Sequence, residues 1–266
     1  MDAVYGDLWS AANVERWAAA QEELRPRPPD HLLELVTGLG LGPASAILDV
    51  GCGRGDYACK LAARFRSQVV ATDPVQSCVD TTRALVREEG LEGLVRVGGG
   101  SIENLAFPAA SFDLVWCRGV IVHLPELLPA LRECRRVLVP GGFMMLQTGY
   151  ATDLLEPGEG ATLRRRLGFV EASMRRATVE EALRTVGLVV LRSEEYGSEF
   201  AEFYESSDGR CAQHLMGIAR LQRAEEAVVD HFGRATYETA LGMFHWQVYQ
   251  LLGKVSYHAY LLGNPR

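Results

Sequence analysis

Hydrophobic residues along the chain follow two periods that alternate. Short apolar runs at residues 47–49 and 68–73 each end in an aspartate. The first is followed by a stretch in which Tyr57, Leu61 and Phe65 recur every four positions. Strands that alternate with amphipathic helices predict a parallel sheet with helices on both faces.

The alternation continues to the end of the chain. Further strand-like runs begin at Leu94 and at Phe112, and others occupy residues 143–148, 188–192 and 257–262. Two further segments with helical patterns, about 151–177 and about 206–253, are longer than the single helix needed to connect neighbouring strands, and we expect them to be helical insertions. Thr178 and Glu181 have the spacing of a capping box, which predicts that the crossover helix begins there.

The first 44 residues differ from the rest of the chain. They carry Tyr5, Trp9 and Trp17, then the stiff proline-rich link at residues 25–29, then an amphipathic helix rich in leucine at residues 32–39. We expect two parts, a helical segment over residues 1–44 and a main domain over residues 45–266.

The turn after the first strand carries the strongest chemical signal. Its sequence, I-L-D-V-G-C-G-R-G-D-Y from Ile47, places glycines at 51, 53 and 55 directly after Asp49. Glycines permit positive φ angles and let a ligand lie against the backbone. The spacing G-x-G-x-G differs from the dinucleotide fingerprint, and the aspartate would repel a diphosphate but could reach an ammonium group.

This turn resembles motif I of the class I S-adenosylmethionine-dependent methyltransferases. Three further features follow in the family's order: Asp73 and Pro74 after the second strand, Ser101 and Ile102 after the third, and Arg118 at the end of the fourth. The resemblance covers about residues 45–148. It implies S-adenosylmethionine as the cofactor, bound by Asp49, Gly51, Cys52, Gly53, Gly55, Asp73, Pro74, Ser101, Ile102 and Arg118.

The resemblance also implies the fold. We expect an α/β protein with a doubly wound, seven-stranded, mostly parallel Rossmann-like sheet. Its last strand, at 257–262, would be antiparallel and inserted next to the fifth, and the added helices would form a cap. In the family, Asp73 would accept the ribose hydroxyls, and an acidic residue usually meets the adenine amino group. Ser101 stands at that acidic position, so we expect a weaker contact or one from the Ile102 backbone.

Candidates for catalysis and substrate binding rest on position alone. His123 follows the fourth strand and is a candidate base, with a structural role in its loop as the alternative. Tyr150, Glu194 and Glu195 are rivals. The predicted substrate pocket comprises Tyr5 and Trp9, as parts of a lid over the cofactor, together with Tyr150, Trp246 and Tyr249. Core packing is the alternative for the two lid residues, and core packing or a subunit interface is the alternative for Trp246 and Tyr249.

Composition limits the class of protein. The chain has 266 residues and a net charge of −7, which does not favour a polyanionic partner, so we expect no nucleic-acid binding. Six cysteines are scattered without metal-ligand spacing, and we expect neither a disulfide framework nor a metal site. No apolar stretch is long enough for a membrane helix, and we expect a cytoplasmic protein that is a monomer or homodimer. An arginine cluster at residues 164–176 fits either an acidic substrate or a solvated helix face.

These features predict a methyltransferase that acts on a small organic molecule, in secondary metabolism. The acceptor atom, whether oxygen, nitrogen or carbon, stays open. One alternative is a scaffold that retains the cofactor and guides another reaction, such as a cyclisation. Another is methylation of RNA or protein.

Overall fold

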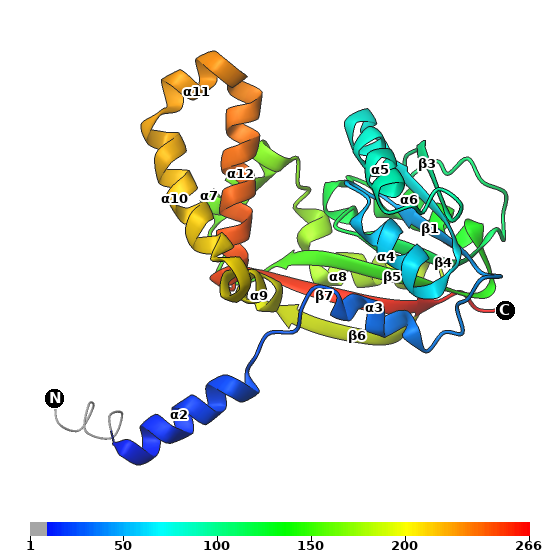
Figure 1. Cartoon of the computed structure of the whole chain (residues 1–266), viewed down its shortest axis with the longest axis horizontal. Coiled ribbons are helices and arrows are strands. Elements are labelled where there is room, and N and C mark those ends of the chain that lie inside the picture. Colours follow the sequence, from blue (N-terminus) through cyan, green and yellow to red (C-terminus); the bar gives the residue numbers. More distant parts are fainter. Residues whose placement is uncertain (1–9) are drawn as a thin grey trace.

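The computed structural model describes residues 10–266 and is built on one seven-stranded sheet (Figure 1). The strand order is β3-β2-β1-β4-β5-β7-β6. All neighbours are parallel except at β7, which pairs antiparallel with both β5 and β6. The fold prediction is confirmed. The strands are β1 (Ala46–Val50), β2 (Gln68–Asp73), β3 (Val95–Gly99), β4 (Phe112–Arg118), β5 (Leu138–Ala151), β6 (Val189–Gly197) and β7 (Val255–Gly263).

Side-chain alternation along the strands gives the sheet two buried faces. In β4, Leu114 and Trp116 pack on one side and Val115 and Cys117 on the other. The first side is covered by α3 (His31–Thr37), α4 (Asp56–Phe65) and α5 (Gln76–Glu88). The second side is covered by α6 (Leu127–Val137) and α8 (Arg176–Thr185).

Helices between the late strands form a cap beyond the ends of β5 and β6 (Figure 1). It comprises α7 (Pro157–Leu167), α9 (Glu199–Asp208), α10 (Arg210–Arg223), α11 (Glu225–Phe232) and α12 (Arg234–Leu251), with the short helix η2 (Ala172–Met174) after α7. A third apolar cluster joins the cap to the sheet through Leu163, Phe169, Trp246 and Val255.

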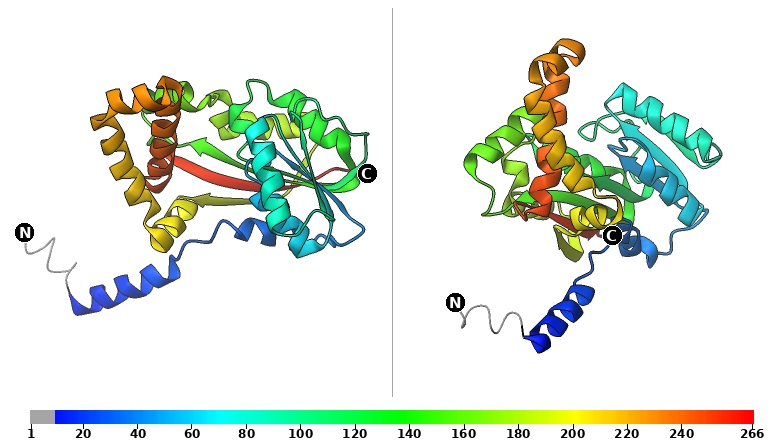
Figure 2. Two further views of the ribbon diagram at one scale, coloured as in Figure 1. Left: turned by 45° about the horizontal axis from the view of Figure 1, so that its top comes forward. Right: turned by 60° about the vertical axis from the view of Figure 1, so that its left-hand side comes forward.

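The proline-rich link after α2 (Ala11–Glu23) contacts β6 and α9 through Arg27. Helix α2 extends away from the body of the molecule in all views (Figures 1 and 2). After it, the Arg27 side chain donates hydrogen bonds to Glu199 at 2.7 Å and Glu194 at 2.8 Å, and its guanidinium lies 4.1 Å from the ring centre of Tyr196. We call this set of contacts the Arg27 clasp.

Some element bounds differ from the predicted ones. Helix α8 begins at Arg176 with the extended residue Arg175 as its N-cap, so Thr178 lies inside the helix and the predicted capping box is wrong. A capping box occurs instead in α7, between Glu156 and Glu159. The helices between β6 and β7 begin at Glu199, earlier than residue 206, because β6 ends at a glycine, Gly197, with φ +51°.

Candidate functional site

Glycines shape the turn between β1 and α4. Gly51, Gly53 and Gly55 have φ angles of +70°, +56° and +90°. A Cβ atom on Gly51 would lie 2.3 Å from Val120 Cγ2, and one on Gly55 would lie 2.6 Å from Thr82 Cγ2. No atom of the described residues lies within 4 Å of a Cβ placed on Gly53. Two of the three glycines are therefore required by packing, and the backbone of the middle one is left open to a ligand.

The Asp73 carboxylate is fixed at the end of the neighbouring strand β2. One oxygen accepts a hydrogen bond from the Gly53 amide and the other accepts one from the Val75 amide, both at 2.9 Å. Each oxygen can accept further bonds, and the side chain is 7% exposed. The aspartate is thus preorganised to accept two hydroxyls.

A cavity of about 520 Å³ opens at the carboxyl ends of these strands. This is where ligands bind in open α/β sheets. It brings together seven of the predicted site residues, although Gly53 and Gly55 do not line it. The lining residues are Gly51, Asp73, Pro74, Val75, Cys78, Ser101, Ile102, Glu103, Arg118, Gly119, Val120, His123 and Leu124.

Asp49 lies beneath the glycine turn rather than in the cavity lining. It is 3% exposed, and its Oδ2 atom has no hydrogen-bond partner among the described residues. Burial raises the pKa of this carboxyl to about 7, although the charge of Arg118 opposes the rise. A cationic ligand group placed nearby would stabilise the ionised form.

Arg118 ends β4 on the same face of the sheet as Asp49. Its guanidinium lies 4.9 Å from the ring centre of Tyr57, which stacks on Trp116. It makes no hydrogen bond and no ion pair within the described part of the chain, and its Nε atom is buried. Its N–H groups can therefore bind a ligand.

His123 lines the cavity from the turn after β4. Its ring packs against Phe169 with centres 5.0 Å apart. Burial lowers the pKa of the imidazole, which favours the neutral form that can accept a proton. The geometry is compatible with both roles considered for this residue, base and loop support.

Cys52 and Tyr150 point away from the cavity lining. The Cys52 thiol contacts Thr82 Oγ1 at 3.6 Å, and burial raises its pKa to about 12, so it stays protonated. The Tyr150 hydroxyl donates to that of Tyr260 at 3.0 Å inside the core. The structure does not bring Tyr150 to the cavity.

The other predicted pocket residues lie in the cap or outside the described range. Trp246 is 7% exposed, packs on Phe169 with ring centres 4.7 Å apart, and donates to the Tyr257 hydroxyl at 3.2 Å. Tyr249 packs at the edge of the same cluster. Tyr5 and Trp9 precede residue 10 and lie outside the described residues.

The remaining candidates are engaged in other contacts. Glu194 belongs to the Arg27 clasp, whereas Glu195 accepts from Ser256 at 3.2 Å. In the arginine cluster, residues 164, 166, 175 and 176 each pair with a glutamate. These pairs fit the solvated-face interpretation.

Sequence reasoning missed several residues at the site. Val75, Cys78 and Glu103 line the cavity, and Tyr57 and Tyr257 lie near Arg118. Val75 and Glu103 could have been predicted, because each directly follows a motif residue in the sequence. Tyr257 could not, because it comes from β7, far along the chain.

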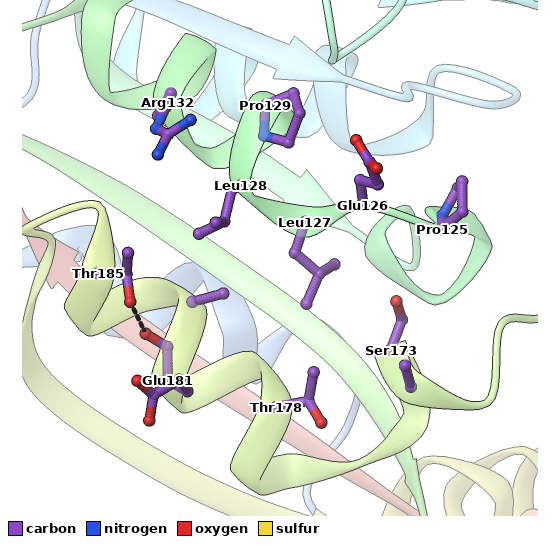
Figure 3. A pocket seen from close by; sticks show the side chains of 12 residues that line it. Pro125, Glu126, Leu127, Leu128, Pro129, Arg132, Ser173, Thr178, Glu181 and Thr185 are labelled. Carbon is purple, nitrogen blue, oxygen red and sulfur yellow. Dashed lines mark hydrogen bonds between the residues drawn. The ribbon is translucent and has the colours of Figure 1, made fainter.

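A second cavity of about 490 Å³ lies between α6 and α8 (Figure 3). Leucines, prolines and alanines form much of its lining, and the polar side chains include Glu126, Arg132 and Glu181. None of the predicted site residues lines it. Over residues 10–266 no cluster of three or more histidine, cysteine or acidic side chains could hold a metal ion. None of the helices described is long and apolar enough to cross a membrane.

Comparison with known proteins matches residues 48–146 to the family model described as Methyltransferase domain. A ubiquinone biosynthesis O-methyltransferase from Xanthomonas axonopodis pv. citri is 37% identical over 144 residues, covering 52% of this chain and 58% of that protein. The 27-O-demethylrifamycin SV methyltransferase of Amycolatopsis mediterranei is 24% identical over 255 residues, covering 92% of this chain and 86% of that protein.

Among solved structures, the [4+2]-cyclase SpnF is similar with a TM-score of 0.70 and 24% identity, covering 89% of this chain and 81% of that one. The chain spans less than two thirds of several curated relatives, at 28%, 37% and 58% of their length for three of them.

Proposed function

Because this chain carries the domain of the class I S-adenosylmethionine-dependent methyltransferases, we propose that it methylates a small organic molecule, in secondary metabolism. The observation that carries the proposal is the cavity at the strand ends, where Asp73 is held by two backbone amides beside an open glycine turn. The two curated relatives described above are methyltransferases named for a quinone pathway and for a rifamycin.

The residues present fit S-adenosylmethionine. Asp73 can accept both ribose hydroxyls, and the open backbone at Gly53 gives the ligand room to lie against the turn. The Asp49 carboxylate, whose Oδ2 atom has no hydrogen-bond partner among the described residues, is charge-complementary to an ammonium group. Ser101 and Ile102, with Glu103 beside them, border the end of the cavity proposed for adenine. We propose the other motif residues as its supporting and lining residues: Cys52, Gly55 and Pro74 on the cofactor side of the cavity, and Arg118 at the end of β4, where the cofactor would adjoin the acceptor.

When bound, the cofactor supplies an activated methyl group on a sulfonium. The protein then has to align the acceptor with that methyl group and exclude water. Where the acceptor carries a proton that must leave, neutral His123 at the cavity wall could accept it. The cap would shape the acceptor site through Trp246 and Tyr249.

The N-terminal segment, residues 1–44, is proposed as a lid on the main domain of residues 45–266. Tyr57 donates a hydrogen bond to the Pro29 carbonyl at 2.9 Å, and its ring also contacts the cavity residue Arg118. The link to α2 therefore passes one side chain away from the cavity. Monomer and homodimer are both compatible with this arrangement.

The test has two stages. S-adenosylhomocysteine binding, measured by calorimetry, should be strong for the wild type. Incubation with methyl-labelled S-adenosylmethionine and an extract of the source organism should then place label in the solvent-soluble fraction. Label confined to nucleic acid or protein would refute small-molecule methylation.

A second candidate is a cofactor-retaining scaffold for another reaction, such as a cyclisation. The similarity of the fold to that of a [4+2]-cyclase supports this second candidate function. In that case the product would form without release of S-adenosylhomocysteine, which the same incubation can measure.

A further inference from the structure

Three polar side chains lie on one face of the sheet, and one of them, Arg118, lines the cavity. Arg118 of β4 pairs in register with Gln147 of β5, and Tyr257 of β7 pairs with Gly149, two residues further along β5. Side chains two residues apart on a strand share a face, so Arg118, Gln147 and Tyr257 point the same way. The core supports this, since Trp116 and Met145 pack in one cluster with Ala259.

Each of the three offers a hydrogen-bond donor for which residues 10–266 supply no acceptor. Gln147 is 1% exposed, and its Nε2 atom has no partner in the described part of the chain. The Arg118 guanidinium likewise has no hydrogen-bond acceptor among the described residues, and its Nε atom is buried. A buried donor that is left unpaired is unfavourable, so a ligand that accepts hydrogen bonds from these groups would be bound favourably.

The Tyr257 hydroxyl is oriented by the cap. It accepts one bond from Trp246 Nε1 at 3.2 Å and one from Gln250 Nε2 at 2.9 Å. The hydroxyl proton of Tyr257 therefore points away from Trp246 and Gln250, and residues 10–266 supply no acceptor for it. Gly149 makes this geometry possible, because a Cβ there would lie 2.8 Å from the Trp246 ring.

We propose that Arg118, Gln147 and Tyr257 form a receptor for an ionised oxygen of the acceptor substrate, as in a phenolate or an enolate. A site with one cation and two neutral donors suits a group that only accepts hydrogen bonds. We call this set the oxyanion receptor. The acceptor's proton would pass to water as the anion binds.

The oxyanion could also belong to the carboxylate of the cofactor, which shares this chemistry. Position favours the acceptor, because Gln147 and Tyr257 belong to β5 and β7, whereas Asp73 and the glycine turn follow β2 and β1 on the other side of β4. The inference rests on the proposed function and assigns its acceptor to the acidic-oxygen class rather than to amines.

The test uses 4-nitrophenol, whose phenolate absorbs visibly, on protein saturated with S-adenosylhomocysteine. We expect bound 4-nitrophenol to ionise at a lower pH than in solution. We also expect Tyr257→Phe and Arg118→Met each to weaken phenolate binding tenfold or more, with little effect on neutral 4-nitroaniline. Tyr260→Phe is the matched control, since that buried tyrosine lies on the opposite face of β7. Thermal melting of each variant checks that it is folded.

The outcomes separate the hypotheses. Absence of S-adenosylhomocysteine binding would overturn the proposed function itself. Normal binding without any preference for phenolate, or an equal effect of Tyr257→Phe and Tyr260→Phe, would overturn the receptor alone. If Arg118→Met and Tyr257→Phe weaken S-adenosylhomocysteine instead of phenolate, the receptor serves the cofactor carboxylate and the assignment to the acceptor is wrong.

Discussion

Single residues at the cavity have separable roles, because some hold the backbone and others face the ligand. Asp73 does both. Its two oxygens fix the amides of Gly53 and Val75, and their remaining lone pairs face the cavity.

Replacing Asp73 by alanine should weaken S-adenosylhomocysteine binding by about ten- to a hundredfold, since hydrogen bonds to a charged group contribute roughly 1.5–3 kcal/mol each and part of that is recovered by water. Calorimetry measures the change. Asp80→Ala on α5 is the control, because that exposed carboxylate accepts hydrogen bonds from the surface residues Gln76 and Arg83. Equal effects of the two variants would contradict the role of Asp73.

Gly51→Ala and Gly53→Ala form a second matched pair. Both positions have positive φ, so both variants are strained by about 1–2 kcal/mol. Only the Gly51 variant also forces a Cβ against Val120, so its melting temperature should fall further. Gly53→Ala should lose ligand affinity at a smaller cost in stability. If both variants lose the same stability, the predicted clash between the new Cβ at position 51 and Val120 does not occur.

Asp49 makes stability depend on pH. Its pKa rises from 3.8 to about 7 on folding because the carboxyl is buried. The folded state then binds more protons than the unfolded state between about pH 4 and pH 7, so stability falls as the pH rises through that window, by on the order of 4 kcal/mol. Asp49→Asn should be more stable than the wild type at about pH 8, and the difference should shrink toward pH 4. Thermal melting across this range tests it, and a difference independent of pH would contradict it.

At the scale of elements, the Arg27 clasp holds the proline-rich link against β6 and α9. The backbone amide of Arg27 also donates a hydrogen bond to Glu199. Its guanidinium donates another to the backbone carbonyl of Glu195. The link stays anchored in this way while α2 extends from the body of the molecule.

Arg27→Ala should release the link without unfolding the domain. We expect faster hydrogen exchange in a peptide spanning residues 24–36, with only a small change in melting temperature because the ion pairs are partly solvated. Arg16→Ala, on the exposed face of α2, is the control. Unchanged exchange in the Arg27 variant would mean that Tyr57 and Pro29 suffice to hold the link.

The same scale shows what sequence could predict. The strands, the glycine turn and the order of the cavity residues were predictable, because each depends on a local period or on neighbours in sequence. The start of α8 was not, because Arg175 takes an extended conformation that the pattern at Thr178 does not indicate. The neighbours Gln147 and Tyr257 were not either, since their relation depends on the register of two strands that are far apart in sequence.

For the whole molecule, the net charge of −7 predicts weak association with polyanions. Filter binding to a mixed RNA at low salt should therefore show no retention above that of an acidic control protein. Salt-sensitive retention would instead indicate a local basic surface and would revive nucleic-acid methylation as a function.

The sheet also divides the molecule at β4. Strands β1 to β3 carry the turn and Asp73, and the segments that form the cap all leave from β5, β6 and β7. The matched family region, residues 48–146, ends inside β5, before the cap begins. Substitutions in the second half therefore leave the glycine turn and Asp73 in place, so the proposed acceptor site can be altered by mutation without touching the proposed cofactor site.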